Sequence, residues 1–340
     1  MTKPAVKRGR LLVADVGGTW TTLAIARAGT DPAIAAYRVY PSQDFNELEA
    51  IVADFLVQPE AAKLDGRIEA ACFSVAGPVA DNASKLTNLG WEVNAAKLAQ
   101  SLGLRTVKLI NDFAAAGQGI GHLAESDVET LQAGQPVEGG TRLIIGAGTG
   151  LGVGVATWQE GGYTVHPSEA GHSDFAPVDG QQDLLLAHLR RSFGRVSYER
   201  VVSGPGLMRI FSFLQEAGTG IPSRQLLDAT RKRNDTAELI AEFAISRLDP
   251  LAVKALDLFV AVYGAFAGNM ALATLPYGGV YISGGIAPKI AAKLKDGMFT
   301  HAFCGKGRFS ELLARITVRL VKNPQVGLLG AILEADRLRG

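Results

Sequence analysis

The chain has 340 residues, more than one ordinary hydrophobic core holds, so two domains are expected. Its 34 basic and 33 acidic residues give a formal net charge of +1, which offers no electrostatic basis for a nucleic-acid or anionic-membrane partner. The two cysteines, Cys72 and Cys304, form no motif, and this usage predicts a reduced, cytoplasmic protein rather than a disulfide framework.

The N-terminal part of the chain changes between strand and helix patterns. Apolar runs at 10–15 and 21–28 predict two strands, and "AAYRVY" predicts a third. A helix is expected next, because Phe45, Leu48 and Phe55 fall on one helical face. "EAACFSVAG" then predicts a strand, "NAAKLAQSL" a helix and "TVKLIND" a strand. Three consecutive strands are therefore followed by an α/β alternation.

The first strand runs into "DVGGT", which contains Asp15, Gly17, Gly18 and Thr19. Two interpretations compete, a routine hairpin turn and a phosphate-binding turn whose N–H groups approach an oxyanion. Glycine serves both, since it allows unusual dihedrals and close approach. An aspartate beside phosphate repels it unless a cation intervenes, so the second interpretation implies Mg²⁺ held by Asp15 through water.

Residues 142–157, "RLIIGAGTGLGVGVAT", repeat this plan of strand, Gly/Thr turn and return strand, with Thr149 and Gly150 in the turn. A dinucleotide fingerprint requires a helix after the glycines, and here a strand pattern follows. The Walker-type loop also fails, because no Gly-Lys-Ser/Thr follows. One such hairpin alone is more often structural, but two in corresponding positions favour phosphate binding.

Acidic residues with small neighbours occur at one strand end and in later loop segments. Asn111 and Asp112 stand where a strand gives way to a small-residue helix, so they are either a helix cap or a substrate ligand and a general base. Glu169 and His172, with Glu199 further on, suit a ligand with several hydroxyl groups. A zinc site is disfavoured because no cysteine cluster completes a ligand set.

Residues 258–288 carry no charged side chain, but Asn269 and Pro276 interrupt the apolar pattern. A membrane span needs around 20 consecutive apolar residues, so we expect a buried helix and then a buried strand. The N-terminal apolar run ends at Asp15 and is too short for a secretory signal. No membrane partner is therefore expected.

Taken together, these motifs resemble the bacterial glucokinase family of the actin-like sugar kinase and Hsp70 superfamily, over about residues 10–335. "DVGGT" and "GAGTGLGVG" look like its two phosphate motifs, and "GGVYISGGIAPK" looks like its adenosine motif. "INDFAAAGQG" and "NPQVGLLGAILEA" resemble the connecting segments. "SVAGPV", "TNLGW", "SEAGHSDFAP" and "SYERVVSGPG" resemble the sugar-side signatures. Their shared order makes the resemblance specific.

The resemblance implies an α/β fold of two ribonuclease-H-like (actin-like ATPase) domains flanking a cleft. A small domain would span 1–111 with a C-terminal helix at 325–340, and a large domain would span 112–324. It also implies ATP- and Mg²⁺-dependent phosphorylation of glucose at the 6-hydroxyl in a cytoplasmic homodimer. Asp112 would be the base, and the other roles would fall on sugar ligands Asn111, Glu169, His172 and Glu199, on Asp15 at Mg²⁺, on phosphate residues Gly17, Gly18, Thr19, Thr149 and Gly150, and on Gly284 and Gly285 at adenosine.

This sequence departs from the family at Trp20, a bulky side chain beside the first turn, and mildly at Ser168 and Ala170, which flank Glu169. Three alternatives to the assignment stay open. The chain could phosphorylate another hexose, use ADP or polyphosphate as donor, or bind sugar as a sensor without turnover.

Overall fold

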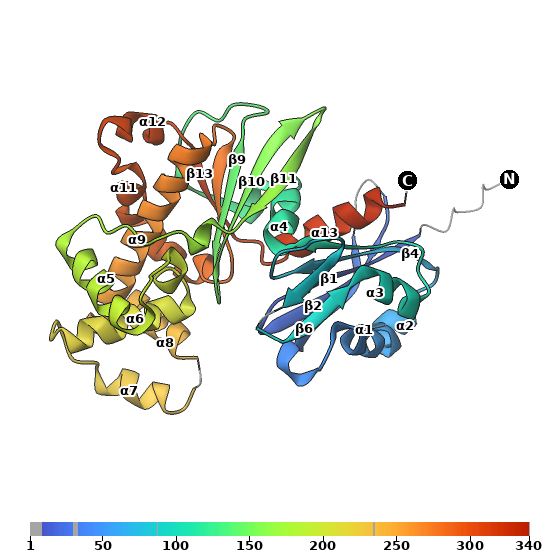
Figure 1. Ribbon diagram of the computed structural model, residues 1–340, viewed down its shortest axis with the longest axis horizontal. Coiled ribbons are helices and arrows are strands. Elements are labelled where there is room, and N and C mark those ends of the chain that lie inside the picture. The colour runs from blue at the N-terminus through green and yellow to red at the C-terminus, as the bar shows by residue number, and fades with distance from the viewer. Residues whose placement is uncertain (1–8, 30–32, 87, 234, 340) are drawn as a thin grey trace. The chain divides into compact units, whose positions relative to one another are not determined.

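The computed structural model describes residues 9–29, 33–86, 88–233 and 235–339. The fold is mixed α/β, and the chain divides into two compact units (Figure 1). Unit 1 comprises Met1–Leu123 and Gln325–Gly340, and unit 2 comprises Ala124–Pro324. Each unit is built around its own sheet and its own hydrophobic cluster.

Unit 1 is built on a five-stranded sheet in the order β3-β2-β1-β4-β7. The three strands predicted in succession form an antiparallel meander, and β4 and β7 then add to β1 in parallel. The strands are β1 (Arg10–Val16), β2 (Trp20–Arg27), β3 (Ile34–Pro41), β4 (Ile68–Val75) and β7 (Val107–Asn111). A separate hairpin pairs β5 (Ala83–Leu86) with β6 (Trp91–Asn94).

Alternate residues of β1 enter two different apolar layers, as the period of a strand requires. Leu12 and Ala14 pack with α1 (Leu48–Val57) and α3 (Ala95–Leu102), while Leu11 and Val13 pack with α13 (Val326–Arg337). A strand buried on both faces reads as a continuous apolar run, which is why "RLLVA" shows no polar alternation. A further short helix, α2 (Pro59–Ala62), follows α1.

The periodicity predicted a helix from about Phe45, but the helix after β3 begins at Leu48. Phe45 instead follows a 3₁₀ turn (Ser42–Asp44), and its ring packs edge-on against Tyr40 at 5.6 Å between centroids. A hydrophobic residue just before a helix therefore extended the apparent helical face without being part of the helix.

Helices α4 (Asp112–Ile120) and α13 lie side by side in unit 1 (Figure 1). Two glycines allow this approach, because a Cβ on Gly119 would strike the carbonyl of Val326 and one on Gly330 would strike that of Ala115. The predicted boundary at 111/112 falls between β7 and α4, whereas compact unit 1 continues to Leu123. The difference follows from this packing, which joins α4 to the C-terminal helix.

Unit 2 repeats the strand plan in the order β11-β10-β9-β12-β13-β8. β9, β10 and β11 form an antiparallel meander, β12 and β13 add to β9 in parallel, and β8 pairs antiparallel with β13. The internal similarity predicted from the sequence is confirmed in these strand directions. The strands are β8 (Val128–Gln132), β9 (Arg142–Ala147), β10 (Leu151–Gln159), β11 (Gly162–Ser168), β12 (Gly279–Ser283) and β13 (Val318–Val321).

Helices of unit 2 pack around α9, a 25-residue helix with fifteen buried residues. By length and composition α9 alone, among the described residues, is apolar enough to cross a membrane, but 78% of its most apolar window is buried inside unit 2. It is the core helix predicted from the sequence, and β12 after it is buried at every position. The helices are α5 (Gly180–Phe193), α6 (Gly204–Glu216), α7 (Arg224–Thr230), α8 (Thr236–Ile245), α9 (Pro250–Thr274), α10 (Ala291–Leu294), α11 (Met298–Cys304) and α12 (Ser310–Ala314).

Candidate functional site

The predicted site residues of unit 1 lie at the carboxyl ends of three adjacent parallel strands. In the register of the sheet, Asp15 of β1 is opposite Ser74 of β4, and Val75 of β4 is opposite Asn111 of β7. Asp112 begins α4 directly after β7. This edge of a parallel sheet is where ligands of α/β proteins characteristically bind.

Asp15 precedes the first turn, and the hydroxyl of Ser74 donates a hydrogen bond to its Oδ1 at 3.1 Å. Its other oxygen faces Gly327 in the first turn of α13, where a Cβ would lie 3.3 Å from Oδ2. Burial raises the pKa of this carboxyl, and the bond from Ser74 offsets only part of that increase. The ionised form of Asp15 therefore gains from any cation that comes near.

The first glycine turn is closed by a backbone bond from Gly17 N–H to the carbonyl of Trp20 at 2.9 Å. Neither Gly17 nor Gly18 has a positive φ, so the expectation of unusual dihedrals at these glycines is wrong. Space is the reason for both, since a Cβ on Gly17 would lie 2.9 Å from the carbonyl of Trp20 and one on Gly18 would lie 3.3 Å from Cβ of Asn88. Thr19 stands exposed at the tip.

Ser42 braces this first turn, and the sequence analysis missed it. Its hydroxyl donates to the carbonyl of Gly17 at 2.8 Å and pairs with the hydroxyl of Thr21 at 2.9 Å. Its backbone N–H donates to the carbonyl of Thr19 at 2.9 Å. Ser42 is fully buried with its hydroxyl bonded, and its loop-like sequence surroundings carry no signal of this role.

Asn111 is the N-cap of α4, one of the two roles that the sequence left open. Its Oδ1 accepts from the N–H groups of Phe113 and Ala114, and its Nδ2 donates to the carbonyl of Gly77 at 3.0 Å. The amide carries two N–H hydrogens and Gly77 uses one, so a cap and a single substrate contact are compatible. Gly77 belongs to the "SVAGPV" segment, which this bond ties to the strand ends.

Asp112 occupies the first turn of α4 and is half-buried. Its Oδ1 accepts from the N–H of Phe113 at 2.9 Å. An acidic residue in a first helical turn interacts favourably with the helix dipole. Such a carboxylate can accept a proton from a hydroxyl group positioned beside it.

The second glycine turn joins β9 to β10 in unit 2, with Gly148 N–H bonded to the carbonyl of Gly150 at 2.8 Å. Thr149 is exposed at its tip, as Thr19 is in unit 1. Gly150 does not have a positive φ, so the dihedral explanation fails here too. A Cβ on Gly150 would instead lie 2.6 Å from Oε2 of Glu199.

Gly284 and Gly285 follow β12, whose carboxyl end is beside that of β9 because Ser283 is opposite Gly146. Gly284 has φ of +85°, and a Cβ there would lie 2.5 Å from the carbonyl of Ala147. Gly285 has open space at its Cβ position. Both glycines are exposed. Because of the register of β12 and β9, they lie at the same sheet edge as the second turn.

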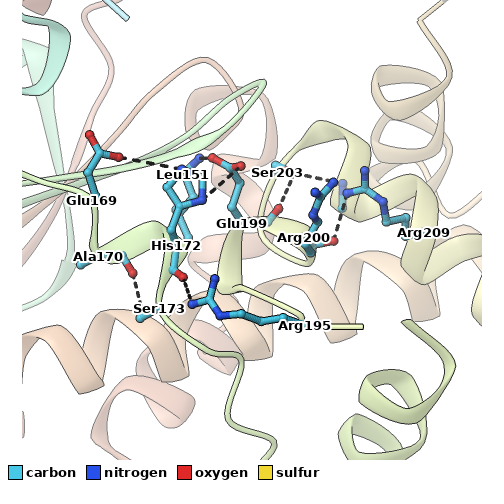
Figure 2. Close-up of polar contacts among 11 residues, drawn as sticks. Leu151, Glu169, Ala170, His172, Ser173, Arg195, Glu199, Arg200, Ser203 and Arg209 are labelled. Atoms are coloured by element: carbon cyan, nitrogen blue, oxygen red, sulfur yellow. Dashed lines mark hydrogen bonds and ion pairs between the residues drawn. The ribbon is translucent and has the colours of Figure 1, made fainter. Parts of the chain in front are cut away.

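The three predicted sugar ligands of unit 2 come together, as Figure 2 shows, with the imidazole of His172 between two carboxylates. Nε2 of His172 is 3.8 Å from Oε2 of Glu169, and Nδ1 is 3.8 Å from Oε1 of Glu199. The side chains of Glu169 and His172 are 66% and 55% exposed and that of Glu199 is 29% exposed, so a ligand can reach all three. Carboxylates that accept and an imidazole that donates or accepts suit a polyhydroxylated molecule.

Arg195 clamps the loop that carries His172, and the sequence analysis missed this residue too. One guanidinium N–H donates to the carbonyl of His172 at 2.6 Å (Figure 2). Its Nε pairs with Asp174 at 2.6 Å. Asp174 and Ser197 also form an isolated backbone bridge. The loops bearing His172 and Glu199 are thus tied together by side chain and backbone.

A search of the described residues finds no group of three or more His, Cys, Asp or Glu that could hold a metal ion. Mg²⁺ does not require such a cluster, since it keeps several waters and commonly uses one or two carboxylates with substrate phosphates. Asp15 fits that pattern, because it is a carboxylate with a raised pKa near the end of β1, two residues before Gly17 of the first turn. Cys72 and Cys304 are both free thiols.

Comparison with known proteins shows that the chain belongs to the glucokinase family, whose model matches residues 12–338. The glucokinase of Trichormus variabilis is 43% identical, with 96% of this chain and 99% of the relative aligned. The glucokinase of Synechocystis sp. is 41% identical, with 94% and 96% aligned. The resemblance drawn from the motifs is confirmed.

Solved structures show the same relationship. A glucokinase from an Antarctic psychrotroph has a TM-score of 0.78 at 29% identity, covering 96% of this chain and 99% of that one. A Balamuthia mandrillaris glucokinase in complex with glucose has a TM-score of 0.80 at 21% identity, covering 96% and 94%. A ROK family glucokinase from Streptomyces griseus, in complex with glucose and AMPPNP, has a TM-score of 0.64 at 20% identity, covering 97% and 100%. The latter two show likeness of fold alone.

Proposed function

We infer that this chain is an ATP-dependent glucokinase, and we propose that it phosphorylates the 6-hydroxyl of glucose. The observation that carries the inference is the family match over residues 12–338, with glucokinases 43% and 41% identical over nearly their whole length. The clustering of Glu169, His172 and Glu199 supports a ligand rich in hydroxyl groups.

Asp112 is the proposed general base. Phosphoryl transfer needs alignment, charge neutralisation and a carboxylate to accept the hydroxyl proton, and little covalent chemistry from the protein. The first turn of α4 presents such a carboxylate at the carboxyl edge of the unit 1 sheet. The remaining N–H of Asn111 would donate to a neighbouring sugar hydroxyl while its other groups keep α4 capped.

The two glycine turns are the proposed phosphate sites, with Gly17, Gly18 and Thr19 in one and Thr149 and Gly150 in the other. The exposed threonine tips would offer hydroxyl donors to phosphate oxygens, and the turns would offer N–H groups other than those of Gly17 and Gly148, which bond the carbonyls of Trp20 and Gly150. Gly284 and Gly285 would lie against adenosine. The reaction requires these groups of unit 2 to meet Asp112 of unit 1 around the bound substrates.

Asp15 is the residue that would hold Mg²⁺, through bound water. When bound, the ion would neutralise charge on the phosphate oxygens. The raised pKa of Asp15 supports this assignment, because a nearby dication would relieve the cost of the buried charge.

We further propose that both units are ribonuclease-H-like domains flanking the catalytic cleft. The strand order and directions common to the two sheets support this, with β8 as an addition in unit 2. Closure of such domains over sugar would exclude water, which competes for the phosphoryl group. A cytoplasmic homodimer remains our expectation, and the two free thiols agree with a reducing compartment.

A coupled assay of ADP release over a panel of hexoses tests the function. A glucokinase releases ADP with ATP, Mg²⁺ and glucose, and far less with mannose, fructose or an amino sugar. Faster turnover of another hexose would make the chain a kinase of that sugar. Sugar binding without ADP release would make it a sensor. Replacing ATP with ADP or polyphosphate in the same assay identifies the phosphoryl donor.

A further inference from the structure

The carboxylate of Glu199 faces in two directions, toward the sugar loop and toward the second glycine turn (Figure 2). Its Oε1 lies 3.8 Å from Nδ1 of His172. Its Oε2 accepts a hydrogen bond from the backbone N–H of Leu151 at 3.0 Å, and Leu151 begins β10 immediately after Gly150. One side chain therefore contacts both the residues proposed for sugar and those proposed for phosphate.

The backbone around Glu199 holds the other side of the same turn. Gly204, the first residue of α6, donates its N–H to the carbonyl of Gly148 at 2.8 Å. Ser203 caps α6 and donates its hydroxyl to the carbonyl of Glu199 at 2.7 Å. The segment from Glu199 to Gly204 thus binds a carbonyl before the turn tip and an N–H after it.

Gly150 shows a second consequence of the same placement of the Glu199 carboxylate. Its φ is not in the left-handed region, so its backbone conformation is open to any residue. A Cβ would lie 2.6 Å from Oε2 of Glu199, so a side chain at this position would force the Glu199 carboxylate away from the turn. The glycine at this position makes room for the carboxylate as well as for a phosphate.

We propose that Glu199 is a positioning residue for the second phosphate turn, in addition to its proposed role as a sugar ligand. The charge-assisted bond to Leu151 N–H fixes where the turn ends, and hence where Thr149 and Gly150 present their donors. This inference rests on the proposed roles of that turn and of His172. It adds that the sugar and nucleotide sites share one carboxylate, so its loss weakens both.

Three variants separate the two roles of Glu199. Glu199→Ala removes the acceptor for Leu151 and the contact with His172. Glu199→Gln keeps an amide oxygen that can accept from Leu151 while removing the charge near His172. Glu169→Ala removes the other carboxylate 3.8 Å from His172, and in the described part of the chain Glu169 forms no hydrogen bond with the turn.

The steady-state readout is the KM for ATP at saturating glucose and the KM for glucose at saturating ATP. Glu199→Ala should raise both, the KM for ATP by about tenfold, which corresponds to ~1.4 kcal/mol. Glu199→Gln and Glu169→Ala should raise the KM for glucose and leave that for ATP within about twofold of wild type. A matched control is Glu216→Ala, which removes a glutamate 3.8 Å from His188 elsewhere in unit 2 and should change neither KM.

Amide hydrogen exchange of a peptide covering residues 148–151, measured without substrates, tests the positioning role independently of catalysis. Protection should fall in Glu199→Ala and remain at the wild-type level in Glu199→Gln. If both variants exchange as wild type does, the positioning role is overturned whatever the activity. If protection changes as expected but the wild-type protein binds no nucleotide, the proposed function fails and the structural link stands.

Discussion

The two glycine turns sit on equivalent hairpins but are held in different ways. The first has its carboxylate in its own strand, since Asp15 of β1 lies two residues before Gly17. The position of β9 equivalent to Asp15 is Gly146, which carries no carboxylate. The carboxylate near the second turn is that of Glu199, from a segment about fifty residues later in the chain.

The side-chain groups that hold the first turn are hydroxyls. The second turn is held by a carboxylate and by the first residue of a helix. Ser42 bonds the carbonyl of Gly17, whereas Glu199 and Gly204 bond the N–H of Leu151 and the carbonyl of Gly148. The comparison teaches that a repeated strand plan sets where a turn lies, and that what fixes it is chosen separately in each unit. In the proposed assignment, the general base Asp112 and the Mg²⁺-binding carboxylate Asp15 both belong to unit 1.

The largest effect is expected at Asp112, because loss of the proposed base removes proton transfer. Asp112→Asn keeps shape and a hydrogen-bonding oxygen, and kcat should fall by ~10²–10⁴-fold while glucose still binds. Single-turnover kinetics and sugar titration measure the two effects. Glu311→Gln, which alters an acidic first-turn residue of α12 in unit 2, is the control and should leave kcat unchanged. Retention of substantial turnover by Asp112→Asn would remove it as the base.

A second large effect is expected at Asp15, with opposite consequences for activity and stability. Because burial raises its pKa above the unfolded value near ~3.9, the folded state binds this proton more tightly. The contribution of Asp15 to the stability of the unliganded wild type should therefore decline as pH rises above about 4, until Asp15 is fully ionised. Asp15→Asn should remove that decline and raise Tm at pH 7.

The same variant should lower Mg²⁺-dependent turnover by ~10²–10³-fold, the usual consequence of removing one electrostatic contact from a reacting centre. Thermal unfolding from pH 4 to 8, without nucleotide, is compared with turnover over a range of Mg²⁺ concentrations. A lower Tm for Asp15→Asn at pH 7, or an unchanged response to Mg²⁺, would contradict the assignment.

A stability effect of intermediate size separates two adjacent glycines of unit 2. Gly284→Ala forces alanine to a φ of +85° and places its Cβ 2.5 Å from the carbonyl of Ala147. We expect a loss of about 1–2 kcal/mol from the backbone conformation alone, with a further loss from the contact. Gly285→Ala is the matched control, because its Cβ meets open space. Urea unfolding should show that Gly284→Ala is less stable than Gly285→Ala. Equal stabilities of the two variants would show that the strand end can adjust.

The sequence predicted the parts of the site that depend on neighbours along the chain. Apolar runs ending in "DVGGT" and "GAGTG" were sufficient to place both hairpins, and a strand-to-helix junction placed Asn111 and Asp112. Cap and ligand had seemed to be alternatives for Asn111. The structure makes it a cap while leaving one N–H hydrogen, because an amide has more bonding capacity than one role uses.

What could not be predicted depends on contacts between distant segments. Ser42 and Arg195 lie in stretches with loop and surface composition, and only the folded chain brings them to Gly17 and His172. From the sequence, the glycines were explained by unusual dihedrals and by close approach to an anion, whereas Gly17, Gly18 and Gly150 have no positive φ and have protein atoms close to where a Cβ would stand. A dihedral requirement has a local sequence signature, whereas a neighbour such as Glu199 or Asn88 has none.

The smallest effect on catalysis tests the comparison most directly, because it separates the groups that hold the two turns. Ser42→Ala removes the hydroxyl that bonds the carbonyl of Gly17 and leaves that carbonyl short of a partner. The expected cost is about 1–3 kcal/mol of stability, with a severalfold increase in the KM for ATP. The KM for glucose should not change, because Ser42 bonds only Gly17, Thr19, Thr21 and Phe45 among the described residues.

Ser101→Ala is the matched control for that variant, since its hydroxyl also donates to a backbone carbonyl in unit 1, that of Leu98, but within α3. It should lose less stability and keep both KM values. The contrast with Glu199→Ala, where both KM values rise, is the distinguishing result. If Ser42→Ala raised the KM for glucose as much as that for ATP, the first turn would be linked to the sugar as closely as the second, and the difference between the two units would disappear.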